Sequence, residues 1–77
     1  MRRYYKVRRK FYGDRDFLIY VEVDGILQNF KRYFSERWHW SSYDSMEELR
    51  DHFLIESVEE ITEEESKNIQ LMWELSR

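Results

Sequence analysis

Alternating apolar and polar positions divide the first third of the chain into strands. Residues 4–12 and residues 17–23 both alternate with a period of two and are rich in aromatic and β-branched side chains. That period is typical of β-strands. Residues 13–16 (Gly-Asp-Arg-Asp) lie between them and are polar, with a glycine able to adopt positive φ. The pattern therefore predicts two strands joined by a turn.

A second turn is predicted at Asp24-Gly25, which lies between Val23 and Ile26. Asp-Gly between apolar residues favours a two-residue hairpin, because both turn positions need positive φ. The apolar positions of residues 26–34 fit either a strand or a helix, and the short turn favours the strand. Residues 35–44 are interpreted as the end of this strand followed by a loop. The predicted inner face of the sheet comprises Tyr5, Val7, Phe11, Phe17, Ile19, Val21, Val23, Ile26 and Phe30.

Two capping signals predict two helices in the second half of the chain. Ser45 is followed three residues later by Glu48, and Thr62 by Glu65, which is the spacing of a capping box. The first helix is expected to end near Phe53 and the second near Leu75, with a weaker strand at residues 54–61 between them. The apolar stripes expected on the two helices are Met46, Leu49 and Phe53, and Ile69, Met72 and Trp73.

These elements predict a small α+β domain. Their order is β-β-β-α-β-α, which indicates an antiparallel meander with the helices packed on one face. A length of 77 residues suits one compact domain over residues 1–77, and the absence of cysteine excludes a disulfide framework. The aromatic rings must therefore supply much of the core.

Charge is sorted along the chain. Residues 1–40 hold ten of the thirteen Lys and Arg, whereas residues 41–77 hold eleven of the sixteen Asp and Glu. Twelve of the fourteen aromatic residues lie within residues 1–43. A basic, aromatic half joined to an acidic half suggests a binding surface.

The first candidate surface is the outer face of the sheet. If Phe11 pairs with Phe17, Lys6 falls opposite Glu22 and Arg8 opposite Tyr20. Tyrosine rings can stack on unpaired bases and lysines can neutralise phosphates, although the same residues are common on an ordinary solvated sheet. This tyrosine–lysine face would comprise Tyr4, Lys6, Arg8, Lys10, Tyr12, Tyr20, Lys31 and Tyr33.

The second candidate surface is Trp38-His39-Trp40 with Tyr43. Trp and Tyr dominate interface hot spots because they bury much area at little entropic cost. The alternative interpretation is that one or both tryptophans fill the small core. The acidic half offers a third surface that could dock on a basic partner, with solvated helix faces as the alternative.

Several classes of function lack a signature in the sequence. His39 and His52 are not spaced as zinc ligands, and no nucleophile motif or phosphate-binding glycine loop occurs. We therefore expect no enzyme activity, no cofactor and no metal site. No apolar run approaches the ~20 residues that cross a bilayer, and the first residues lack the apolar middle of a signal peptide. The expected location is the cytoplasm, away from membranes.

The sequence thus predicts a small non-enzymatic binding module whose partner is another protein. Compact, cysteine-free, charge-polarised chains of this length resemble the accessory inhibitors that bacteriophages make against host or defence proteins, which would place this chain in the host cytoplasm. A single-strand nucleic-acid binder is the second hypothesis and a homodimer the third. The residues expected to contact the partner are first Trp38 or Trp40, then Tyr33, Arg8 and Lys10.

Overall fold

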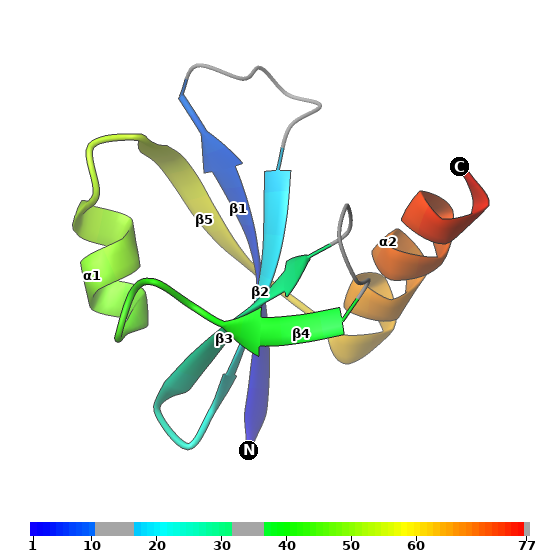
Figure 1. The fold of residues 1–77 in the computed structure, drawn as a ribbon, viewed down its shortest axis with the longest axis horizontal. Coiled ribbons are helices and arrows are strands. Elements are labelled where there is room, and N and C mark those ends of the chain that lie inside the picture. The colour runs from blue at the N-terminus through cyan, green and yellow to red at the C-terminus, as the bar shows by residue number, and fades with distance from the viewer. Residues whose placement is uncertain (11–16, 32–36, 77) are drawn as a thin grey trace.

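A computed structural model describes residues 1–10, 17–31 and 37–76 (Figure 1). Within these residues the chain forms five strands and two helices. They are β1 (Arg2–Arg9), β2 (Phe17–Val23), β3 (Ile26–Lys31), β4 (Arg37–Trp40), α1 (Met46–Asp51), β5 (Ile55–Ile61) and α2 (Glu63–Leu75).

The described strands form one antiparallel sheet in the order β4-β3-β2-β1-β5. The first four are neighbours in sequence order, as in a meander. β5 comes after α1 and returns to the far side of β1. The predicted α+β class is therefore confirmed, with a strand order that departs from a simple meander at β5.

The Asp24-Gly25 hairpin is confirmed in detail. Val23 pairs with Ile26, and both turn residues have positive φ, 52° at Asp24 and 81° at Gly25. The residues after the turn continue as β3, so the strand interpretation is correct over Ile26–Lys31 and the helix interpretation is wrong there.

The predicted register of the first hairpin is wrong. Phe11 lies outside the described residues, but Phe17 pairs with Arg8, and Lys6 pairs with Ile19 instead of Glu22. This is a shift of three residues relative to the prediction. Because side chains alternate with a period of two, an odd shift moves every side chain of β1 to the other face of β2.

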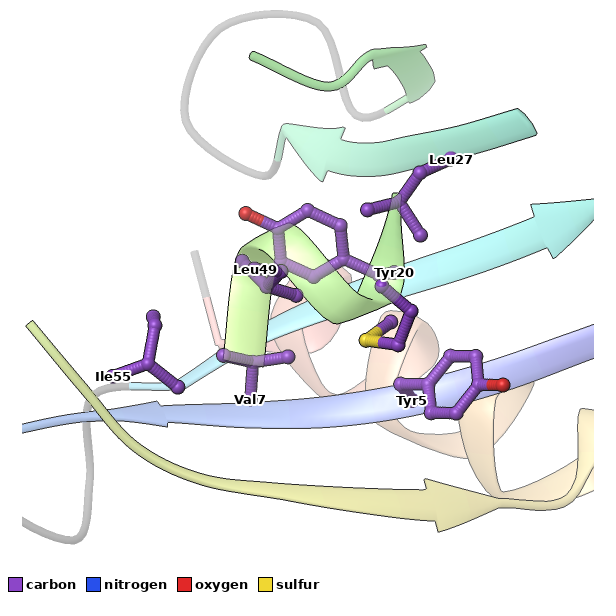
Figure 2. Packing of buried hydrophobic residues seen from close by; sticks show 7 residues of the cluster. Tyr5, Val7, Tyr20, Leu27, Leu49 and Ile55 are labelled. Atoms are coloured by element: carbon purple, nitrogen blue, oxygen red, sulfur yellow. The ribbon is translucent and has the colours of Figure 1, made fainter. Parts of the chain in front are cut away.

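The sheet is buried on both faces, with one helix on each. Tyr5, Val7, Tyr20 and Leu27 pack with Met46 and Leu49 of α1 and with Ile55 (Figure 2). Tyr4, Ile19, Val21, Phe30 and Ile61 form a second cluster, against which Ile69 and Trp73 of α2 pack. We call these the α1 face and the α2 face. The helices lie on opposite sides of the sheet (Figure 1), so the prediction that both cover one face is wrong.

Two-sided burial explains why the predicted inner face fails. Tyr5 and Val7 lie on the α1 face, whereas Ile19, Val21 and Phe30 lie on the α2 face. The consecutive residues Tyr4 and Tyr5 are both buried, with 7% and 2% of their surfaces exposed. Alternation with a period of two identifies a strand. It cannot show whether one or both sets of alternating side chains are buried when both sets contain tyrosine.

β4 occupies residues that the sequence assigned to a strand end and loop. Its four residues pair antiparallel with β3, from Lys31 with Arg37 to Gln28 with Trp40. The sheet curls strongly, and β4 lies across the direction of β2 (Figure 1). The ring of Trp38 consequently comes within 6.2 Å, centroid to centroid, of Tyr4 on β1. Three strand spacings would separate these strands by about 14 Å in a flat sheet.

The helices begin as predicted, although their apolar stripes differ from the prediction. Thr62 and Glu65 form a complete capping box on α2, and the Ser45 hydroxyl accepts from the Glu48 N–H on α1. The Glu48 carboxylate accepts from the Asp44 N–H (3.0 Å), one residue before the expected donor. Phe53 lies beyond the end of α1 and is exposed, and Met72 is also exposed, so neither belongs to a buried stripe.

Removing either cap should lower stability measurably. We expect Ser45→Ala and Thr62→Ala each to reduce the free energy of unfolding by about 0.5–2 kcal/mol, as lost N-caps do. Urea denaturation of the two variants checks this, with Ser42→Ala as a serine control in the exposed bend before the helix. Unchanged midpoints in both capping variants would show that these hydroxyls do not stabilise the helices.

Candidate functional site

The predicted tyrosine–lysine face does not exist as one surface. Tyr4, Lys6 and Arg8 point to the α2 face, whereas Tyr20 lies on the α1 face. Lys10 is exposed just after β1, and its N–H donates to the Leu54 carbonyl (2.8 Å). Lys31 is the last residue of β3, while Tyr12 and Tyr33 lie outside the described residues.

The two tyrosines of that face that the structure describes, Tyr4 and Tyr20, are part of the core. Tyr4 and Tyr20 expose only 7% and 3% of their surfaces, so neither ring can stack on an unpaired base. The Lys6 ammonium lies 4.3 Å from the centre of the Phe17 ring, and Arg8 is half-buried. Tyr4 and Tyr20 therefore hold the two clusters together and do not form a nucleic-acid platform.

The fold also brings part of the basic half of the sequence beside part of the acidic half. The acidic strand β5 lies directly beside the basic strand β1, and Lys6 is paired in register with Glu59. The Arg3 guanidinium donates two hydrogen bonds to the Glu60 carboxylate, at 2.8 and 3.2 Å. The Arg3 hydrogen bond lowers the pKa of Glu60 below its ordinary value. Opposite charges that are far apart in sequence thus become neighbours in space.

Tyr20 should make the protein sensitive to alkali. Burial is the main cause that raises the pKa of Tyr20 to about 12, from an ordinary value of 10.0. The unfolded chain then loses this proton first, so the contribution of Tyr20 to stability is complete below about pH 10 and is lost as pH rises toward about 12. We expect a loss of about 1.4 kcal/mol per pH unit across that range.

Tyr20→Phe keeps the ring and removes the titrating hydroxyl. Urea midpoints measured for both proteins between about pH 9 and pH 12 should therefore fall less steeply in the variant. Parallel curves for the variant and the original protein would show that Tyr20 does not carry this dependence.

Trp38 and Trp40 have different environments although both point to the α2 face. Trp38 packs edge-on against Phe30 with ring centroids 5.4 Å apart, and it belongs to the α2-face cluster. Trp40 exposes 71% of its surface. One tryptophan therefore fills the core, as the alternative interpretation predicted, and the other is presented to solvent.

Trp40 lies on the end strand of the described sheet and is the most exposed member of a small uncharged group of side chains. Its cross-strand neighbour is Gln28, and Ile26, two residues before Gln28 on the same face, is 51% exposed. Val23 pairs with Ile26 and is half-buried. We call these residues (Trp40, Gln28, Ile26 and Val23) the Trp40 surface. Because they stand on paired strands, the backbone positions from which these side chains project are set by the sheet.

Exposed apolar side chains also occur at two other places. Phe53 stacks on the His52 ring at 4.9 Å but is 71% exposed. Leu71, Met72 and Leu75 project from the second half of α2. Leu71 borders a groove of about 470 Å³ together with Phe30 and Trp73. The sequence predicted none of these as contacts.

A second cavity of about 390 Å³ lies between α1 and the sheet. It is lined by Arg3, Tyr5, Glu22, Met46, Glu47, Arg50 and Asp51. Its charges are mixed, and Arg3 is already occupied by Glu60. Among the described residues, no three His, Asp or Glu side chains lie close enough together to hold a metal ion.

Sequence reasoning identified Trp40 but missed its surroundings. Ile26 was assigned to the core, but it is 51% exposed. Within residues 1–10, 17–31 and 37–76, no helix is long and apolar enough to cross a membrane. No family model, curated protein or solved structure matches this chain.

Proposed function

We propose that this chain is a non-catalytic protein-binding module, acting in the cytoplasm as an inhibitor or accessory factor, with Trp40 as its principal anchor. The observation that carries this proposal is the 71% exposure of Trp40 beside the half-exposed Ile26 on a hydrogen-bonded strand. Covering such a ring supplies about 2–4 kcal/mol from apolar burial alone. A rigid aromatic anchor flanked by smaller apolar contacts is the usual arrangement of an interface hot spot.

The arrangement of cations and rings favours a protein partner over single-stranded nucleic acid. Nucleic-acid binding without sequence preference uses a charged groove with exposed rings along it. Here Tyr4 and Tyr20 are buried on opposite faces, and Arg3 is paired with Glu60. The exposed Trp40 is paired with Gln28, and both Gln28 and the next residue on that face of β3, Ile26, are uncharged.

Affinity capture from the source cell tests the proposal. The bait would be the tagged protein, with Trp40→Ala and Phe53→Ala as a matched pair, since both rings are 71% exposed. We expect to recover a partner protein whose association persists after nuclease treatment. The Phe53 variant should retain this partner and the Trp40 variant should lose it. Recovery of nucleic acid, or of a protein that both variants retain equally, would contradict the proposal.

A further inference from the structure

Among the described residues, no strand pairs with the outer edge of β4, where the backbone groups of both tryptophans lie. The Ser41 N–H donates to the Leu27 carbonyl (3.3 Å), which makes Ser41 and Leu27 a hydrogen-bonded pair. Hydrogen-bonded and non-hydrogen-bonded pairs alternate along an antiparallel ladder. His39 and Arg37 therefore bond to β3 like Ser41, whereas Trp38 and Trp40 turn their N–H and C=O groups away from β3. In the described sheet β4 is an end strand.

The two edges of the sheet differ in how they are protected. Natural proteins guard sheet edges with charged side chains. β5, the other edge, carries Glu56, Glu59 and Glu60 and is in contact with α1. β4 has the sequence Arg-Trp-His-Trp, with Arg37 as its only permanently charged residue. In the part of the chain that the structure describes, β4 is therefore the less protected of the two edges.

Side chains on the two faces of β4 indicate which residues a complementary partner strand would carry. On the α2 face, a residue opposite Trp40 would cover the exposed ring and continue the apolar surface of Ile26. On the α1 face, Arg37 is exposed at the start of the strand, and its positive charge would lie beside an added strand. The complementary segment alternates apolar residues with carboxylates.

The chain contains an internal example of this chemistry. Acidic β5 pairs antiparallel with basic β1, and the pairing includes the Arg3–Glu60 ion pair at 2.8 Å. Within the described residues Arg37–Trp40, a second copy aligned β4 to β4 would pair another Arg37 and no carboxylate with this strand. Charge complementarity therefore favours a foreign acidic strand over that dimer.

We propose that the partner binds by adding an extended, acidic segment to the outer edge of β4, with apolar side chains over Trp40 and a carboxylate beside Arg37. This proposal rests on the proposed function and specifies its binding mode. Main-chain hydrogen bonds at Trp38 and Trp40 hold the segment, and alternate side chains supply selectivity, as in other cases of strand addition.

A displayed library of random linear peptides, selected on the folded protein, provides the probe. We expect the enriched peptides to alternate apolar and acidic residues, and to protect the Trp38 and Trp40 amides from hydrogen exchange while leaving the exchange of the His39 amide unchanged. Trp40→Ala and Trp40→Pro both remove the ring, but only the proline variant also removes the outward N–H. An edge strand tolerates proline at such a position. Binding should fall about tenfold further in the proline variant, the usual effect of one hydrogen bond. Melting temperatures confirm that both variants are folded.

Each outcome of this experiment decides the proposal. If the alanine and proline variants both lose affinity for the peptides, and by the same factor, strand addition is overturned, whereas the Trp40 anchor still stands. Peptides that ignore the ring, or the absence of any enriched peptide, would overturn the binding mode, and ring-independent binders would also contradict the proposed function. Protection of the same amides by self-association, without peptide, would assign the edge to a second copy.

Discussion

Tyr4→Ala and Tyr5→Ala should each destabilise the protein severely, although the two residues are consecutive on one strand. Each ring is buried in a different cluster, Tyr4 on the α2 face and Tyr5 on the α1 face. Truncating a buried aromatic residue to alanine costs about 3–5 kcal/mol. A domain of this length has about 4–12 kcal/mol of total stability. Chemical denaturation should therefore show that both variants are largely unfolded or unfold at very low denaturant concentration.

The control for this pair is Arg2→Ala, an exposed position on the same strand. Its free energy of unfolding should change by no more than about 0.5 kcal/mol. If one of the two tyrosine variants were as stable as the control, the sheet would have a solvated face, and the burial of both faces would be incorrect.

The two tryptophans of β4 should separate stability from binding. Trp38→Ala removes a ring packed against Phe30 and Tyr4 and should cost about 2–4 kcal/mol of stability. Trp40→Ala should change stability by no more than about 0.5 kcal/mol. The same variant should weaken partner binding by at least about 2 kcal/mol, or roughly 30-fold. The measurements are a denaturation curve for each variant and a titration with the captured partner.

The opposite pattern would reverse the assignment. If Trp40→Ala bound normally while charge reversal at Glu47, Glu48 or Glu59 abolished binding, the acidic residues would form the contact surface. All three are exposed, so their reversal should leave the fold intact. This comparison shows whether the basic, aromatic half of the chain or its acidic half contacts the partner protein.

Local signals in the sequence predicted local structure well. The Asp-Gly turn, the Thr62–Glu65 capping box and the Ser45 cap each depend on residues within four positions of one another, and each is confirmed. Turn geometry also set the register of the second hairpin, because two residues leave little freedom. The first hairpin has a longer connection, so its register depends on tertiary packing and was predicted incorrectly.

The candidate surface was only partly predictable for the same reason. Periodicity could not show that Tyr4 and Tyr5 pack on opposite faces, because each face is completed by a helix far away in sequence. Nor could it show that β5 would return beside β1 and pair Glu60 with Arg3. The charge polarity that suggested a basic surface is real in the sequence, but the topology places the acidic strand β5 beside the basic strand β1. The Trp38-His39-Trp40 segment was recognised as unusual, but its pattern could not show that Trp38 packs against Phe30 and Tyr4 while Trp40 is exposed.

The most direct test of the Trp40 anchor is ¹⁹F NMR of protein labelled with fluorotryptophan, which reports on all three tryptophans at once. Substituting each tryptophan singly with phenylalanine assigns the resonances. In the free protein, the Trp40 resonance should show the largest shift on exchange from H₂O to D₂O, because its ring is the most exposed. Addition of the captured partner should remove that solvent shift and move the Trp40 resonance most. A Trp40 resonance that keeps its position and its solvent shift in the saturated complex would contradict the account.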